Sequence, residues 1–214
     1  MIQLNKLPKP LVLEENGTEW TKDLMELVNS GKKIPANIGG RYRHTQIKDA
    51  VKIETNEKCA YCECNITHQY PGDVEHIIPK AIYRRLTFTW KNLSFVCYWC
   101  NNHKSDYIDK SCKLINPYSD EIENHLQAFG PIIMHINKSK RGELTWREIK
   151  LNRIKLVERR TEALENLQNL IDRYEDEKIL ALKQIFKMEL EENIKSDSEF
   201  SFIKKQYLKD RGII

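Results

Sequence analysis

The chain has 214 residues, a length typical of one domain or of one domain with an appendage. Hydrophobic residues make up 40% of it and charged residues 31%, so it can bury a core beneath a well-solvated surface. The net charge of +4 permits nucleic-acid binding without arguing for it, and no apolar run is long enough to cross a bilayer.

The first residues predict an extended arm followed by helices. Residues 1–17 contain two prolines, which disfavour a regular helix, and they lack the small-residue cleavage site of a secretion signal. Residues 18–30 place apolar side chains at helical spacing, and a second helix is expected from Arg43 to Thr55. We assign residues 1–56 to an N-terminal arm with helices, and we expect a cytoplasmic protein.

The character of the sequence changes near Cys59. From there to Asp106 the segments are short, rich in aromatic and β-branched residues, and interrupted by Asn, Pro and Gly. This pattern is typical of small strands and turns rather than of long helices. We assign residues 57–112 to a separate unit.

Residues 113–214 predict a mainly helical extension. The stretch INPYSDEIENHLQAFG indicates a turn and a short helix, and PIIMHIN indicates a strand. From about Thr145 to Asn193 the apolar residues follow one long helical pattern. Two interpretations remain open, a coiled-coil arm or an amphipathic helix (or pair of helices) packed on its own domain, and the spacing favours the second.

Four of the six cysteines form two C-x-x-C pairs, in KCAYCE and VCYWCNN, with 34 residues between the pairs. Thiols stay reduced in the cytosol, and two such knuckles can complete a tetrahedral zinc site. A redox-active C-x-x-C normally stands alone beside a βαβ pattern, so structural Zn²⁺ is the stronger interpretation. The expected ligands are Cys59, Cys62, Cys97 and Cys100, whereas Cys64 and Cys112 are interpreted as ordinary thiols.

The segment between the knuckles carries a cluster of polar residues. GDVEHIIPK contains Asp73, Glu75 and His76, while CNNHKSD, directly after the second pair, contains Asn101, His103 and Lys104. A zinc ion that joins the knuckles would hold these two stretches close together. Between them, FTWKNLSF places Asn92 just before an apolar strand.

Glu75, His76, Asn92 and Asn101, interleaved with the four cysteines, resemble the HNH endonuclease family. The resemblance covers about Cys59 to Asp106 and implies a ββα-metal core. We therefore expect an α+β fold, mainly α, in which a zinc-stapled HNH core lies between N-terminal helices and a long C-terminal helical region.

This resemblance also implies roles for individual residues. His76 would act as general base, which suits an imidazole that is largely neutral at cytosolic pH. Glu75 and Asn101 would bind one divalent ion, Mg²⁺ being the first choice, with Asp73 as the reserve ligand. Asn92 would orient the loop next to the histidine by hydrogen bonding. The expected contacts to nucleic-acid phosphates are Lys80, His103 and Lys104.

Motifs outside the core are similar to a narrower branch, the HNH subunits named PtuB of the anti-phage systems called Septu, which are also found beside retrons. These motifs are MIQLNKLPKP, INPYSDEIENHL and LNRIKLVERR. The branch implies a nuclease of antiviral defence that works with an ABC-type ATPase, PtuA. DNA is the expected substrate, and tRNA is possible for relatives linked to retrons.

Two other functions remain open. A zinc-knuckle module could bind nucleic acid without cutting it, but such a module has no need of Glu75, His76 and Asn101 at their positions. A standalone restriction or homing nuclease is expected to carry its own DNA-reading motif, and none is visible in this sequence.

Overall fold

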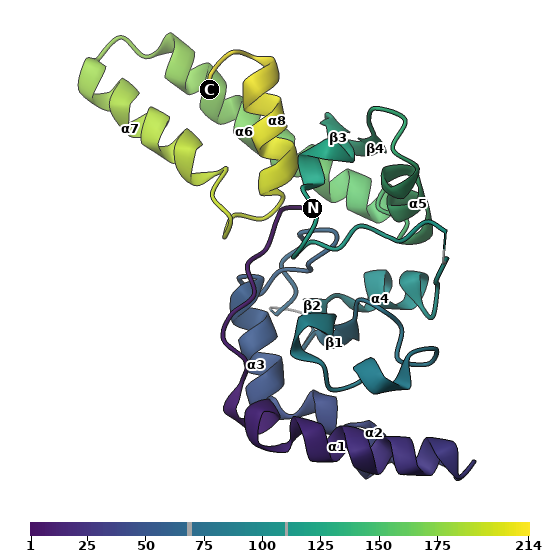
Figure 1. Cartoon of the computed structure of the whole chain (residues 1–214). Helices are drawn as coiled ribbons and strands as arrows, with labels where there is room; N and C mark the ends of the chain where they lie inside the picture. The colour runs from purple at the N-terminus through teal and green to yellow at the C-terminus, as the bar shows by residue number, and fades with distance from the viewer. Residues whose placement is uncertain (68–69, 110) are drawn as a thin grey trace.

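A computed structural model describes residues 1–67, 70–109 and 111–214. Helices dominate, and the described strands form two antiparallel two-stranded sheets, so the expected α+β, mainly α, fold is confirmed (Figure 1). The helices are α1 Leu11–Asn29, α2 Ala36–Gly39, α3 Thr45–Glu54, α4 Tyr98–Lys104, α5 Lys140–Glu148, α6 Ile154–Asp176, α7 Leu180–Glu192 and α8 Ser201–Asp210. The strands are β1 Asp73–His76, β2 Leu93–Val96, β3 Leu126–Phe129 and β4 Ile132–His135, and the single-turn 3-10 helices are Arg41–Arg43, Arg84–Leu86, Trp90–Asn92 and Ile122–Asn124.

The N-terminal arm is shorter than the sequence predicts. The prediction that residues 1–17 are extended is wrong beyond Pro10, because α1 begins at Leu11. A proline is compatible with a helix start, where the missing N–H would have no partner within the helix. The remaining arm crosses the middle of the molecule, with Leu4 N bonded to Pro117 O at 2.8 Å and Trp90 Nε1 bonded to Leu7 O at 2.8 Å.

The centre of the molecule is a hairpin followed by a helix. Strands β1 and β2 pair antiparallel, in a register that sets Asp73 opposite Val96 and His76 opposite Leu93. Every residue of β2 is buried, and α3 packs against this strand. Helix α4 follows directly after Cys97, so the order strand, strand, helix is completed within residues 73–104.

The C-terminal region does not form one long helix. The helical pattern expected from Thr145 to Asn193 is divided among α5, α6 and α7, in agreement with the interpretation of packed helices. The first break contains Lys150 at φ +51° and Asn152, whose side-chain amide bonds the backbone N–H and C=O of Ile133 at 2.9 and 2.7 Å. An asparagine that bonds backbone groups elsewhere in the molecule favours a loop over a helix.

The second sheet lies beside these helices. The strand predicted at PIIMHIN is present as β4, but its partner β3 occupies residues for which the sequence predicts a helix. Gly130, at φ +56°, lies in the short turn that joins the two strands. Among the described residues, no helix combines the length and apolarity that a membrane span requires.

Gly72 provides a test of how tightly the hairpin is packed. The residue precedes β1 at φ +68°, and a Cβ atom there would overlap the ring of the buried Phe95. We expect Gly72→Ala to lower the free energy of unfolding by about 2–4 kcal/mol, the sum of backbone strain and overpacking. The matched control Gly130→Ala has a similar φ but open space around it, and it should lose only the backbone contribution of about 1–2 kcal/mol. Equal losses in urea titrations would contradict the role of Phe95.

Candidate functional site

The four predicted zinc ligands lie together in the structure. The Sγ atoms of Cys59, Cys62, Cys97 and Cys100 all lie within 4.8 Å of one another, and Cys62 Sγ is 3.8 Å from Cys97 Sγ. A tetrahedral ion with metal–sulfur bonds of about 2.3 Å requires sulfur atoms about 3.8 Å apart. The cluster therefore has the dimensions of a four-cysteine metal site.

Helix α4 begins inside this cluster. Cys97 is the N-cap residue of α4, and its sulfur accepts a hydrogen bond from the backbone N–H of Cys100 at 3.4 Å. Burial raises the pKa of Cys59, whereas hydrogen bonds from neighbouring thiols lower the pKa of Cys62. One thiolate is thus favoured over the others, and a divalent cation would supply the charge that allows all four to ionise.

Arg153 contacts the cluster from the C-terminal region. Its guanidinium, at the start of α6, lies 3.6 Å from Cys100 Sγ, 3.7 Å from Cys62 Sγ and 3.9 Å from Cys97 Sγ. Although burial opposes it, the charge of the thiolates raises the pKa of Arg153. Four thiolates and one divalent cation leave two negative charges, which Arg153 partly neutralises. Arg153 is far from the cysteines in the sequence and belongs to no metal-binding pattern, so sequence reasoning missed its contact with the cluster.

Strand β1 and helix α4 face each other through two polar pairs. Asp73 and Glu75 are two residues apart on a strand and share a face, while Asn101 and Lys104 are three apart on a helix and share another. The amide nitrogen of Asn101 donates to Asp73 Oδ2 at 3.0 Å, and Lys104 Nζ donates to Glu75 Oε1 at 2.6 Å. Tyr70 Oη donates to Asp73 Oδ1 at 2.8 Å. The two pairs fix the position of α4 along β1.

The pair of Lys104 and Glu75 lies inside the protein. The side chain of Lys104 is 1% exposed and that of Glu75 is 9% exposed. Burial raises the pKa of Glu75, and the charge of Lys104 opposes this shift. Lys104 Nζ also donates to the backbone oxygen of His76 at 2.9 Å. Lys104, expected among the phosphate contacts, is thus engaged internally, and the carboxylate beside Asn101 is that of the reserve candidate Asp73.

His76 is held in one orientation at the end of β1. Its Nε2–H donates to the carbonyl oxygen of Thr87 at 3.0 Å, which leaves Nδ1 as the acceptor of the neutral ring. The ring of Tyr42 lies edge-on to it, with centroids 4.5 Å apart. Burial lowers the pKa of His76 to about 3; the bond to Thr87 opposes this effect and nearby positive charges add to it. Those charges belong to Arg43, Lys80 and Lys104.

Asn92 fastens the loop that follows His76. Its Oδ1 accepts from Ile78 N at 2.8 Å, and its Nδ2 donates to Ile78 O at 3.0 Å and to Leu86 O at 3.3 Å. The buried amide therefore holds both ends of the segment that leads from His76 to Thr87. This contact fixes the carbonyl group that orients the histidine.

The two other expected phosphate contacts have different surroundings. Lys80 is half-buried, and its ammonium donates to the hydroxyl of Tyr42 at 3.1 Å. His103 donates from Nδ1 to the carbonyl oxygen of Trp99 at 2.6 Å, on the outer side of α4. Tyr42 and Tyr70 have supporting contacts that sequence reasoning missed, because each lies outside the motif and is brought to it only by folding.

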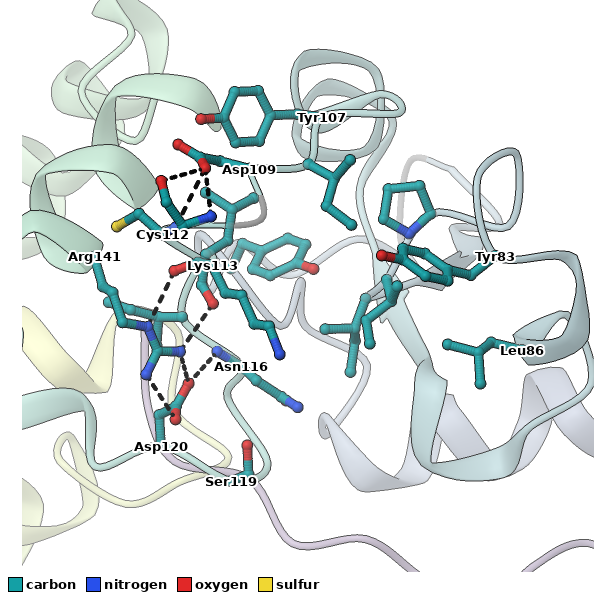
Figure 2. A pocket seen from close by; sticks show the side chains of 18 residues that line it. Tyr83, Leu86, Tyr107, Asp109, Cys112, Lys113, Asn116, Ser119, Asp120 and Arg141 are labelled. Atoms are coloured by element: carbon teal, nitrogen blue, oxygen red, sulfur yellow. Dashed lines mark hydrogen bonds and ion pairs between the residues drawn. The ribbon is translucent and has the colours of Figure 1, made fainter.

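A cavity of about 700 Å³ opens beside the segment that follows His76. Its lining includes Ile77, Tyr83 and Tyr107, and Figure 2 shows Tyr83 on one side and the pair of Arg141 and Asp120 on the other. The Arg141 guanidinium also donates to the carbonyl oxygens of Lys113 and Leu114 at 3.0 Å each. Aromatic and apolar side chains thus line one part of the cavity, and the ion pair of Arg141 and Asp120 lines its polar end.

Comparisons with known proteins agree with this geometry. The HNH endonuclease family model matches residues 59–107. The chain is also 29% identical over 182 residues to the Septu protein PtuB of Bacillus thuringiensis, across 82% of this chain and 66% of that protein. It is 26% identical over 158 residues to the Septu protein PtuB of Bacillus mycoides (strain KBAB4), across 59% of this chain and 54% of that protein. The chain thus spans less than two thirds of the length of either relative. Residues 59–107, which contain the cysteine cluster, the hairpin and α4, are an HNH endonuclease domain.

Proposed function

We propose that this chain is a metal-dependent endonuclease that hydrolyses phosphodiester bonds of nucleic acid, with DNA as the first candidate. It would be the nuclease subunit of a Septu-like antiviral system and would work with an ABC-type ATPase. The similarity to two Septu proteins named PtuB supports the biological setting. The observation that carries the activity is the buried, neutral His76, whose Nδ1 is free to accept a proton, at the end of a strand that also carries the carboxylates of Asp73 and Glu75.

His76 would act as the general base. Its Nδ1 takes a proton from water while the water oxygen forms a bond to phosphorus and the bond to the 3′ oxygen breaks. Thr87 stabilises the protonated ring by accepting from Nε2, as an orienting carbonyl does for a catalytic imidazole. Lys80 and Arg43 place positive charge near the same ring, which suits an anionic phosphate.

Asp73 and Asn101 would hold the catalytic cation, with Glu75 on the same strand face. Hard divalent ions prefer oxygen ligands, and the carboxylate of Asp73 already touches the amide group of Asn101. When bound, Mg²⁺ neutralises charge on the phosphate and on the leaving oxygen. Glu75 is the weaker ligand of the two acids, because Lys104 already compensates its charge.

The four cysteines would bind structural Zn²⁺, and α7 is the favoured surface for the ATPase. The N-terminal arm is less suited to docking, because it is bonded into the core at Leu4 and Leu7. Helix α7 instead exposes apolar side chains, among them Leu180, Ile185 and Met188. Helix α7 lies at the far end of the molecule from α1 (Figure 1).

Zinc content tests the cysteine cluster. We expect about one zinc ion per chain in the purified protein and little zinc in Cys59→Ser, which should also unfold at a lower temperature because a structural ion stabilises its fold. The control Cys112→Ser should keep the full metal content, since Cys112 lies outside the cluster. Elemental analysis after gel filtration measures both, and a Cys59→Ser protein with unchanged zinc would refute the site.

Plasmid cleavage with Mg²⁺, in the presence of the ATPase partner, tests His76. His76→Ala should lower the cleavage rate at least about 100-fold, the usual contribution of a general base. Its zinc content should stay unchanged, since His76 contacts none of the cysteines. His125→Ala is the control, because His125 bonds Ser139 and lies outside the domain. A non-catalytic binding module would instead give the same nicking background for all three proteins.

A comparison of the two acids tests which one holds the cation. Asp73→Asn should raise the Mg²⁺ concentration for half-maximal cleavage by at least about tenfold. Glu75→Gln should act mainly on stability, with a loss of about 3–5 kcal/mol in urea titrations, because it leaves Lys104 buried without a counter-charge. If Glu75→Gln shifts the Mg²⁺ dependence more than Asp73→Asn does, the ligand is Glu75.

A further inference from the structure

Helix α4 has an inner face that holds the site and an outer face built from aromatic rings. At 100° per residue, Cys100, Asn101 and Lys104 point to one side, and Tyr98, Trp99 and His103 to the other. Tyr98 is 51% exposed and Trp99 is 58% exposed. Large aromatic side chains are usually well buried, so two adjacent exposed rings on one helix are unusual.

These rings are held in a defined arrangement. The centroids of Tyr98 and Trp99 are 5.4 Å apart at an interplanar angle of 78°, and those of Trp99 and His103 are 6.1 Å apart at 36°. The bond from His103 Nδ1 to the carbonyl oxygen of Trp99 ties the imidazole to the preceding turn. The arrangement leaves large π surfaces in contact with solvent, with little freedom left to lose on binding.

The outer face lies next to the residues proposed for cleavage. Tyr98 and Asn101 are three residues apart on α4, so their side chains are neighbours on the helix surface. The ring of Tyr98 also packs edge-on against that of Trp99, so the surface beside Asn101 continues to Trp99. A nucleic-acid strand that reaches Asp73 and Asn101 therefore passes beside Tyr98 and Trp99.

Positive charge accompanies the aromatic face. Arg153 Nη1 lies 3.6 Å from Cys100 Sγ on α4 and donates to the carbonyl oxygen of Lys150 at 3.4 Å, so Lys150 lies close to this helix. Arg153 is engaged with the cysteine sulfurs, whereas Lys150 is exposed. The exposed lysine would contact a phosphate of a nucleic-acid strand, and the exposed rings would stack on a base of the same strand.

We propose that Tyr98, Trp99 and His103 form a stacking surface for unpaired nucleobases, so that the chain cuts single-stranded or locally unpaired nucleic acid. The inference rests on the proposed function and names its class of substrate. Aromatic side chains stack on the faces of bases, and in a duplex those faces are covered by the neighbouring base pairs. The shared chemistry of unpaired DNA and unpaired RNA makes both strands suitable probes.

Binding to labelled oligonucleotides tests the proposal. Full-length, zinc-loaded His76→Ala protein serves as the reference, so that no cleavage occurs during the measurement. Fluorescence anisotropy would compare a mixed-sequence single strand of DNA, the same strand as RNA, and the blunt DNA duplex. We expect tighter binding of at least one single strand than of the duplex. Adding Trp99→Ala should weaken the preferred single strand about 5- to 100-fold and the duplex less than about twofold.

Two further variants separate stacking from structure. Trp99→Phe keeps an aromatic ring and should recover most of the affinity. Phe129→Ala removes a ring of similar exposure, 54%, from the hairpin of β3 and β4, and it should leave binding unchanged. Circular dichroism and zinc content would verify that each variant is folded.

The possible outcomes are distinct. Equal loss of single-strand and duplex binding in Trp99→Ala, no loss, or no measurable binding by the reference protein would each overturn the inference. Loss of ATPase binding with unchanged affinity for nucleic acid would also overturn it and would assign the rings to a protein partner. The proposed function itself fails only if the chain with active His76 cuts neither paired nor unpaired nucleic acid in the presence of its partner.

Discussion

The convergence of four cysteine sulfurs determines how the rest of this protein is arranged. One pair precedes the β1–β2 hairpin and the other opens α4, so an ion between them would fix both ends of the domain. The hairpin is short, with four residues in each strand, and an isolated two-stranded hairpin is at best marginally stable in water. A metal ion bound by the four sulfurs would supply the stability that such a small core lacks and would hold α4 against β1.

The second constraint is the pairing of charges between β1 and α4. A buried lysine and a buried glutamate compensate each other, while the neighbouring aspartate contacts an asparagine. The same interface therefore combines two different pairs. Lys104 compensates the charge of Glu75, whereas Asp73 contacts the neutral amide of Asn101. This asymmetry distinguishes Asp73 from Glu75 although the two acids are only two residues apart. His76, the next residue, lies against the Thr87 carbonyl and receives the combined field of several cations.

The spacing of the cysteines predicted the metal cluster, and the resemblance of the EHIIP stretch and its neighbours to a known family predicted the HNH core, because both are local sequence patterns. Properties that depend on tertiary contacts were not predictable in this way. Lysine is usually found at the protein surface, and only the packing of α4 against β1 shows that Lys104 is buried. Tyr42 reaches His76 from the 3-10 helix Arg41–Arg43, more than thirty residues away along the chain. The division of the C-terminal helices depends on the bonds of Asn152 to Ile133, which a helical pattern does not contain.

Arg153 lies outside the stretch that matches the HNH family, yet its guanidinium contacts three of the four sulfurs. A fragment limited to residues 59–107 would keep all four cysteines of the cluster and both strands of the hairpin. It would nevertheless expose the excess negative charge of a metal-loaded cluster without the cation that now balances it. The stretch matched by the family model is thus smaller than the unit that we expect to retain a bound metal, and an expression fragment of this domain should extend through the first turn of α6.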